Sequence, residues 1–547
     1  MERVAGTLLA LGLAWLLGYF LVAVFWRDRP CDPAGRLLCL AAAFGLGVGA
    51  TASLDFLWLV IFGKAWRGTT VLLDLAVLLL LLFADRRLPR PSFRLARPLR
   101  PQEWYLGAIF LFFSAVALGT VGTLLLRGPD GAWDAIAIWN ARAKFLNAPS
   151  LDGWKALFDP IMEITHPDYP PLLPASVARG WQYAGHSIPL VPMLLALSFT
   201  FALLSLITAA VGVVQGPLLG GAGCAVLASS PIFLGTAMLQ YADLPLAYYF
   251  LLAVALLHRA DQEERPGPGL HVLAGLAAGM AALTKNEGCL FVVALGAGRI
   301  LRVLLLSRAA YRREKRGETP GLSRRCARRE LGKLAWWLAG MAPALGLLLL
   351  YKSFAPANYL VSAQGSDWAG RLLSRPRASL IMNYVLDELA RPRSDAVLYV
   401  QRAPTWHWHL LASTALLLLL GIDRRRLAQT VSRAVLVLAG LGLLAAILQM
   451  HRPGGSMGWH WLAVFVALSS IVGFGFGSHR LRPPSFLAAA CTFVLVNLGY
   501  LAAFLLTPLD LRWQLLTAAG RLIFHTLPLA VFIAFLALVP FRRDHAG

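Results

Sequence analysis

The chain has 547 residues, of which 58% are hydrophobic and only 14% are charged. Soluble domains carry about 25% charged residues, so this composition excludes an ordinary soluble protein and predicts a polytopic membrane protein. The formal net charge of +22 does not predict a nucleic acid partner, because the Lys and Arg residues lie in short loops between apolar runs, where they set membrane orientation. The six cysteines are scattered and predict neither disulfides nor a zinc site.

Apolar runs of roughly 16 to 25 residues predict about fifteen transmembrane helices. The first run, residues 4–26, follows a single arginine and lacks a small-residue cleavage site, so we interpret it as a retained span and not as a signal peptide. The predicted spans are residues 5–25, 37–63, 69–84, 103–126, 189–213, 218–237, 243–258, 270–285, 287–306, 334–351, 407–421, 433–450, 459–476, 486–506 and 521–541.

Arginine-rich loops determine the predicted orientation, because cytoplasmic loops keep the excess of Lys and Arg. Residues 85–100 and 307–333 form two such loops, and both are predicted to be cytoplasmic. The polar, aromatic and proline-rich segments then fall on the opposite side, mainly in the outer loops 127–188 and 352–406. This asymmetry places any chemistry on the non-cytoplasmic face, and the second outer loop is a candidate for acceptor recognition.

The outer loop 127–188 is the first long polar interruption of the chain. Apolar residues recur in it at three- and four-residue steps, at Ile136, Trp139, Ala143 and Leu146. This spacing predicts an amphipathic helix from Trp133 to Asn147 that lies on the bilayer surface. Its polar side would carry Asp134, Asn140, Arg142 and Lys144.

A proline-rich segment, His166–Pro171, follows in the same loop. Each proline removes a backbone donor and restrains the residue before it to extended geometry, so the segment cannot be regular helix. We expect a stiff loop that holds His166, Asp168 and Tyr169 in place.

Two acidic residues at successive outer turns are the candidate catalytic residues. Asp134 lies at the start of the amphipathic helix, and Asp243 ends the turn at residues 240–243. Either carboxylate could simply cap a helix, where free N–H groups and the helix dipole stabilise it. The alternative is a general base or a substrate-orienting carboxylate at the membrane interface. Two acids at the same membrane face favour this second interpretation.

Cationic side chains at the same level suggest a phosphate site. Lys285 ends a span beside Glu287, and it either reaches lipid headgroups or contacts a lipid-linked phosphate. The same two interpretations apply to Arg142, Lys144, Arg512 and Arg521. No metal site is predicted, because the histidines of the C-terminal half are too weakly patterned. They are His407, His409, His451 and His460.

Three features resemble the GT-C superfamily of polyprenyl-phosphate-dependent glycosyltransferases, in particular the protein O-mannosyltransferases and the aminoarabinose transferases of lipid A. They are Trp133-Asp134 followed by His166-Pro-Asp-Tyr-Pro-Pro171, the Tyr241-Ala-Asp243 turn, and the helix ending at residues 274–288. The resemblance implies an all-α integral membrane protein, a GT-C-type multi-spanning helical bundle. Its parts would be additional N-terminal helices (1–101), a catalytic module (102–306), a basic cytoplasmic loop (307–333) and a C-terminal module (334–547).

The resemblance also implies roles for the residues of the outer face. Asp134 would be the catalytic base, and Asp243 the second acid of the site. The candidates for holding the donor phosphate are Lys285, Arg142, Lys144 and Arg512. The expected substrate contacts are His166, Asp168, Tyr169, Tyr241 and Glu287.

We therefore expect an inverting glycosyltransferase that moves a sugar from a polyprenyl-phosphate-linked donor to a lipid, glycan or protein acceptor. Its location would be a bacterial plasma membrane, with the site facing the periplasm or exterior. No cofactor is predicted, and a divalent metal stays open.

Two other classes are weighed against the enzyme. A lipid or polysaccharide transporter or flippase usually carries inverted repeats and charges near the membrane midplane. No repeat is evident and the acids mark span ends, which favours the enzyme. A non-catalytic scaffold for envelope assembly would need no acids at the interface.

Overall fold

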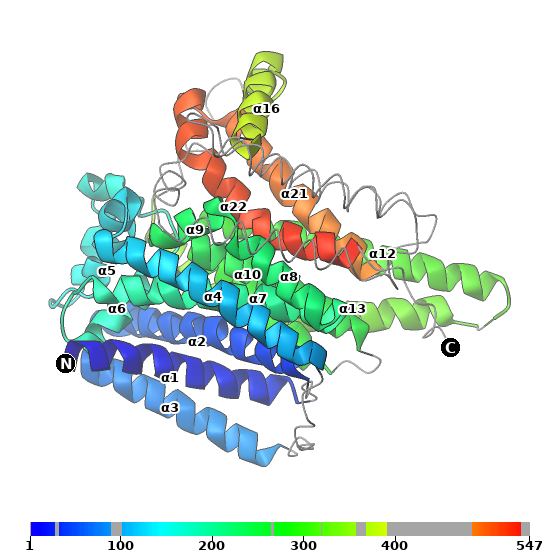
Figure 1. Ribbon diagram of the computed structural model, residues 1–547, viewed down its shortest axis with the longest axis horizontal. Coiled ribbons are helices and arrows are strands. Elements are labelled where there is room, and N and C mark those ends of the chain that lie inside the picture. Colours follow the sequence, from blue (N-terminus) through cyan, green and yellow to red (C-terminus); the bar gives the residue numbers. More distant parts are fainter. Residues whose placement is uncertain are drawn as a thin grey trace.

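The computed structural model describes residues 2–27, 32–88, 101–263, 267–318, 320–356, 368–390 and 484–537, and these residues form helices without any strand (Figure 1). Ten of the described helices are long and apolar enough to cross a membrane, or eleven if the bent pair α8–α9 counts as one span. The predicted all-α, multi-spanning membrane fold is confirmed.

The long helices lie side by side in one bundle (Figure 1). The N-terminal part contains α1 (Glu2–Phe25), α2 (Pro33–Phe62), α3 (Arg67–Arg87) and α4 (Pro101–Arg127). The first outer loop contains η1 (Ala135–Asn140), α5 (Ala141–Leu146), η2 (Gly153–Phe158), η3 (Pro160–Thr165) and α6 (Leu172–Ala184). The centre contains α7 (Leu190–Gln215), α8 (Pro217–Ala228), α9 (Pro231–Met238), α10 (Asp243–Gln262), α11 (Gly269–Thr284), α12 (Asn286–Lys315) and α13 (Leu322–Lys352). The C-terminal part contains α15 (Trp368–Leu372), α16 (Arg375–Ala390), α21 (Pro484–Leu506) and α22 (Leu511–Ala537).

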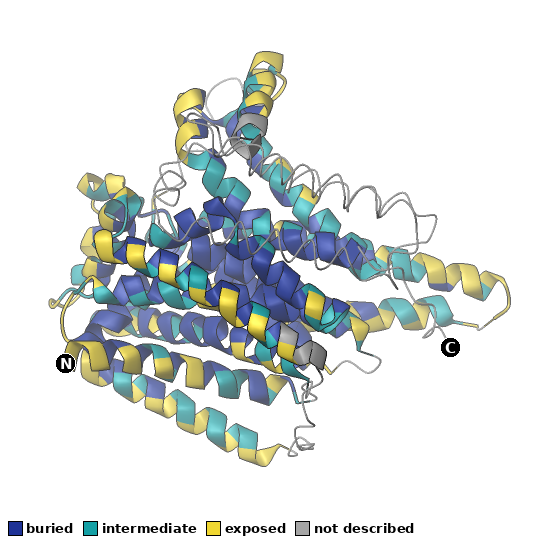
Figure 2. Cartoon of the chain, viewed as in Figure 1, coloured by how far each residue is buried: buried dark blue, intermediate teal, exposed yellow. Residues whose placement is uncertain are grey.

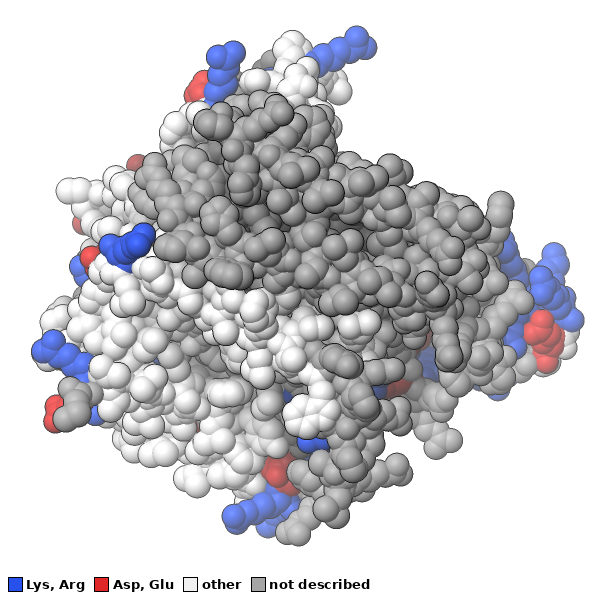
Figure 3. Space-filling model, in the orientation of Figure 1, with Lys and Arg blue, Asp and Glu red and all other residues white. Residues whose placement is uncertain are grey.

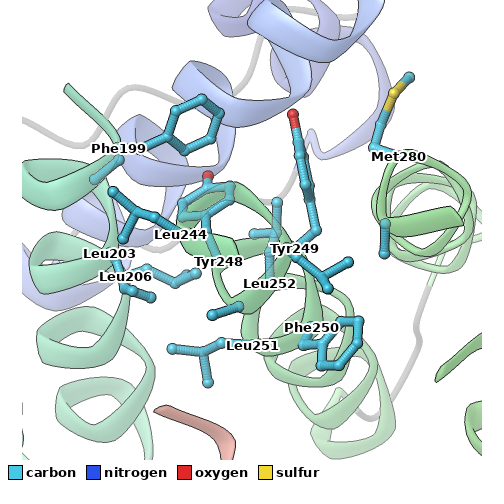
Figure 4. Packing of buried hydrophobic residues seen from close by; sticks show 14 of the residues in the cluster. Phe199, Leu203, Leu206, Leu244, Tyr248, Tyr249, Phe250, Leu251, Leu252 and Met280 are labelled. Atoms are coloured by element: carbon cyan, nitrogen blue, oxygen red, sulfur yellow. The ribbon is translucent and has the colours of Figure 1, made fainter. Parts of the chain in front are cut away.

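Helix α10 is the core of the bundle and is buried along nearly its whole length (Figure 2). It packs against α7, α11 and α22, and its apolar surface on all sides suits this central place. The hydroxyls of Tyr248 and Tyr249 donate to the carbonyls of Ala41 and Gly45 on α2, and Figure 4 shows both hydroxyls on the same side of α10. A Cβ atom at Gly45 would lie 2.1 Å from a ring carbon of Tyr248, so only glycine allows this close approach.

Helix α3 attaches to the bundle through polar side chains. The residues that it buries are Thr69, Thr70 and Asp74. Asp74 pairs with Arg179 of α6 and accepts a hydrogen bond of 2.5 Å from the Tyr183 hydroxyl, and Arg179 Nε lies 3.5 Å from Asp55 Oδ2 of α2. The expectation that acids mark only span ends is therefore wrong, because Asp55 and Asp74 lie within helices α2 and α3.

Helices α12 and α13 form a hairpin that extends beyond the other helices (Figure 1). Most of the predicted basic loop 307–333 is thus helical. Ion pairs fix the base of the hairpin to the end of α10: Arg299 and Arg302 lie 2.6 and 2.9 Å from Asp261, and Arg302 also pairs with Glu330. Figure 3 shows charged side chains gathered at the tip of the hairpin and at the other helix ends.

Every predicted span within the described residues coincides with a helix, although residues 218–237 form the bent pair α8–α9, with 65° between its two halves. The start of the last span is corrected: α22 begins at Leu511 and not at residue 521, because the Asp510 carboxylate accepts from the Trp513 N–H at 2.8 Å and caps the helix. The spans predicted at 407–421, 433–450 and 459–476, with His407, His409, His451 and His460, lie outside the described residues, as does much of the outer loop 352–406.

The amphipathic helix predicted from Trp133 to Asn147 is present, but it begins as the π-helix η1 and continues as α5. Two of its side chains lie on the side opposite to the predicted one. Ile136 is exposed and Arg142 is fully buried. A π-turn holds more residues than an α-turn, so the buried face shifts relative to the one that a regular helix predicts.

Candidate active site

Four segments that are distant in the sequence bring charged side chains together at one end of the bundle. Asp134 precedes η1, Asp243 begins α10, Lys285 lies between α11 and α12, and Arg521 and His525 lie one turn apart on α22. The Arg521 guanidinium joins the two acids. Its Nη1 lies 2.7 Å from Asp134 Oδ2, and its Nη2 lies 3.0 Å from Asp243 Oδ2.

Asp243 is fully buried, and three other side chains contact its carboxylate. Lys285 Nζ lies 3.1 Å and His525 Nε2 lies 2.5 Å from Oδ1, while Arg521 donates to Oδ2 through Nε at 3.2 Å and Nη2 at 3.0 Å. An ionised carboxylate has the lone pairs to accept all these bonds, and the neighbouring cations favour its charged form. Because both oxygens are engaged and inaccessible, Asp243 is suited to holding the cations in place.

Asp134 is the acid that reaches the surface of this cluster. Its side chain is 17% exposed and that of Arg521 is 21% exposed. The carboxylate makes no capping hydrogen bond to η1, so its partner is Arg521 and the simple capping interpretation is wrong. A carboxylate and a guanidinium therefore lie next to each other, and both are partly exposed.

Tyr241 contacts both Asp134 and Arg521. Its hydroxyl accepts from the Asp134 N–H at 3.2 Å, and the Arg521 guanidinium lies over its ring at 4.8 Å. Burial, together with the nearby Asp134 carboxylate, raises the pKa of Tyr241 to about 12. Tyr241 therefore stays neutral at physiological pH and acts as a fixed support for both side chains.

Lys285 lies inside the cluster, nearly inaccessible, in an extended residue that separates α11 from α12. Its ammonium pairs with Asp243 at 3.1 Å and with Glu287 at 2.9 Å, and it lies over the Tyr169 ring at 5.8 Å. Lys285 is thus a second cation, besides Arg521, that contacts the Asp243 carboxylate.

The loop His166–Pro171 is not helical, as its prolines predict, and its carbonyls are held from two sides. The Tyr351 hydroxyl donates to the Pro167 carbonyl at 2.6 Å, and Lys352 donates to the Asp168 carbonyl. Arg142 donates to the carbonyls of Tyr169 and Pro170 and to the Tyr351 hydroxyl. Arg142 is therefore buried behind the loop, where it holds backbone.

The same loop places side chains against Lys285 and Asn286, where α11 meets α12. Asp168 accepts a hydrogen bond of 2.8 Å from Asn286, which in turn accepts from Lys352 at 2.8 Å. The ring of Tyr169 stacks between Trp139, at 5.6 Å, and the partly exposed His166, at 5.0 Å. His166 precedes Pro167 but has a φ of 49°, so the extended geometry predicted for the residue before this proline is wrong. Its left-handed conformation turns the chain into the loop.

The structure brings together most of the residues singled out in the sequence. They are Asp134, Asp243, Lys285, Glu287, Tyr241, Asp168 and Tyr169, with His166 at the edge. Lys144 and Arg512 are exposed on their helices, and among the described residues neither forms an ion pair with the acids of the cluster.

Several residues of the cluster were not chosen from the sequence. They are His525, Asn286, Tyr351 and Lys352, while Arg521 was considered only alongside Arg512. One sequence signal could have identified Arg521 and His525 as site residues. They are four residues apart in an otherwise apolar run, so they share one face of the predicted helix. Among the described residues, no group of three or more His, Cys, Asp or Glu side chains is placed to hold a metal ion.

No family model and no curated protein matches the chain. Among solved structures, the chain is similar to a crystal structure of ArnT from Cupriavidus metallidurans bound to undecaprenyl phosphate. The overlap covers 80% of this chain and 77% of that chain, at 17% sequence identity and a TM-score of 0.33. An overlap this loose supports no conclusion about the present chain, so its function is inferred from its own site.

Proposed function

We propose that the chain is a GT-C-type membrane glycosyltransferase that moves a sugar from a polyprenyl-phosphate donor to an acceptor hydroxyl on the non-cytoplasmic face. One observation carries the proposal: Arg521, on the spanning helix α22, joins a partly exposed carboxylate, Asp134, to a buried one, Asp243, which begins the spanning helix α10. The site therefore offers a base and a phosphate-binding cation side by side. Both are what transfer from a lipid-linked sugar phosphate requires.

The chemistry follows from a change of partner at Arg521. In the structure its guanidinium forms an ion pair with Asp134. Two oxygens of a donor phosphate can accept two parallel hydrogen bonds from the Arg521 guanidinium. Binding of the donor would therefore draw Arg521 away from the Asp134 carboxylate. Asp134 would then be free to accept the proton of the acceptor hydroxyl.

In the transfer step the acceptor oxygen attacks the anomeric carbon of the sugar, and the bond from that carbon to the phosphate oxygen breaks. The electron pair leaves with the polyprenyl phosphate, whose negative charge grows from about one to two. Arg521 stabilises this developing charge more strongly in the transition state than in the ground state. A single displacement inverts the anomeric centre.

The arginine distribution supports the location in the proposal. The predicted cytoplasmic loops hold the excess of Lys and Arg, and the residues of the site come from segments predicted to lie on the other side. A bacterial plasma membrane with the site facing the periplasm or exterior is the proposed location.

One observation favours the alternative of a lipid or polysaccharide transporter or flippase. Asp55, Asp74 and Arg179 form a buried cluster, with both acids inside spanning helices. Ionisable residues within the membrane are typical of transport pathways. A transporter would move the intact lipid and leave the sugar on its phosphate, so the chemical products distinguish the two functions.

The test is sugar transfer by the purified protein in lipid, from a panel of polyprenyl-phosphate sugars, for wild type, Asp134→Asn and Asp130→Asn. Asp130 is an exposed acid of the same loop, so it is the matched control. We expect Asp134→Asn to lower the transfer rate by about 10²- to 10⁴-fold, the range for loss of a general base. Asp130→Asn should transfer at the wild-type rate. Unchanged transfer by a folded Asp134→Asn protein would refute the assignment of the base.

A further inference from the structure

His525 is fully buried on α22, and its two ring nitrogens contact two other helices. Nε2 lies 2.5 Å from Asp243 Oδ1 at the start of α10, and Nδ1 lies 3.1 Å from the Tyr500 hydroxyl on α21. Neither nitrogen is near the accessible edge of the site, so His525 is not placed to touch a substrate. Its contacts nevertheless lead to the acid that holds Arg521.

The contacts of His525 assign its tautomer. Asp243 also pairs with Lys285 and Arg521, so it is ionised and can only accept hydrogen bonds. Nε2 therefore carries a hydrogen and donates it to Asp243. The buried phenol of Tyr500 needs an acceptor for its own hydrogen, and among the described residues Nδ1 of His525, at 3.1 Å, is the acceptor that it contacts. The imidazole is thus neutral, with its hydrogen on Nε2 and its orientation fixed by Tyr500.

Arg521 and His525 act on the same carboxylate from the same helix. They are four residues apart, so both project from one face of α22. His525 contacts Oδ1 of Asp243, and the Arg521 fork contacts Oδ2. Lys285 is the other partner of Oδ1, but it also pairs with Glu287 at 2.9 Å. Without the imidazole, the carboxylate could rotate and the guanidinium would lose the support that aims its Nη1 at Asp134.

We propose that His525, oriented by Tyr500, is a positioning residue that fixes Asp243 and thereby sets Arg521 between the two acids. The inference rests on the proposed function, since Arg521 is the group that binds the donor phosphate there. The chain of contacts from Tyr500 through His525, Asp243 and Arg521 ends at Asp134, so a buried residue pair controls the geometry at the accessible edge.

The experiment compares His525→Leu, which removes the donor, with His525→Gln, which keeps an N–H at the position of Nε2. His258→Leu is the control, because His258 is a buried histidine at the opposite end of α10. Structures of the variants in lipid should show Arg521 displaced from Asp134 in His525→Leu and retained in His525→Gln. Loss of an outer-shell partner that orients a metal ligand costs about 10- to 100-fold. By the same argument we expect kcat/KM for the donor to fall by about that factor in His525→Leu, because the displaced Arg521 both binds the donor phosphate and stabilises its developing charge.

A measurement on the wild type does not depend on how the variants fold. Nitrogen NMR of histidine-labelled protein in lipid should show the neutral Nε2–H tautomer for His525, identified by its absence from His525→Gln. A charged imidazole, an Nδ1–H tautomer, or an intact pair of Arg521 with Asp134 in His525→Leu would overturn the proposal. If the wild type transfers no sugar, the proposed function fails instead, while the structures and spectra still decide whether His525 positions Arg521.

Discussion

At the scale of single residues, the site depends on Arg521. It is the side chain that contacts both Asp134 and Asp243, and it also lies over the ring of Tyr241. From the sequence it was no more prominent than Arg512, because both lie near the end of an apolar run. The structure separates them, since Arg512 is exposed and forms no ion pair with these acids among the described residues.

Replacing Arg521 by Gln should remove both phosphate binding and the charge that stabilises Asp243. We expect the transfer rate to fall by more than about 100-fold, as on loss of a donor that stabilises developing charge. The protein should also lose about 3 kcal/mol of stability, because a fully buried carboxylate keeps fewer cationic partners. Transfer kinetics and thermal unfolding in detergent measure the two effects. Arg512→Gln is the control, and a comparable loss there would contradict the assignment.

At the scale of elements, the most informative segment is the loop His166–Pro171. Its irregular course was predictable from its prolines, since they exclude a helix. Its partners were not predictable, because the carbonyls are held by Arg142 and by the end of α13, which are distant in sequence. Arg142 was assigned to the exposed face because the periodicity argument assumed a regular α-helix, and the π-helix η1 changes that register.

Replacing Arg142 by Ala should release this loop while leaving the acids intact. Amide hydrogen exchange should rise at His166, Asp168 and Tyr169, the residues of the loop that have an N–H. Because the loop presents Asp168 and Tyr169 to the site, transfer should fall as well. Lys144→Ala, an exposed cation on the same helix, should leave both exchange and transfer unchanged. Protection that stays the same in Arg142→Ala would show that α13 alone holds the loop.

At the scale of the whole molecule, the spanning helices could be predicted from the sequence. Which helices and which of their polar side chains lie next to one another could not. Each apolar run of sufficient length gives its helix directly, because a span must satisfy its backbone hydrogen bonds internally. Which helix lies at the centre depends on packing between distant segments, such as Tyr248 against Gly45. For the same reason Asp134 and Asp243 could be named as candidates, while their common partner on α22 could not.

The attachment of α3 is a second property of the whole bundle. Since Asp74 is its charged contact with Arg179, Asp74→Ala should weaken the docking of α3 and cost about 3 kcal/mol of stability, by leaving a buried arginine with one acid fewer. Leu79→Ala is the control, because Leu79 lies on the exposed face of the same helix. Thermal unfolding in lipid or detergent measures both variants, and equal unfolding midpoints for them would show that the ion pair does not hold α3.

The most direct measurement follows a donor labelled in both its sugar and its lipid, in vesicles that contain the purified protein and an acceptor. A glycosyltransferase must break the bond between sugar and phosphate. We therefore predict equal amounts of sugar on the acceptor and of free polyprenyl phosphate, both formed about 10²- to 10⁴-fold more slowly with Asp134→Asn. Labels that stay together on one lipid while it crosses the bilayer would contradict the account and identify a flippase.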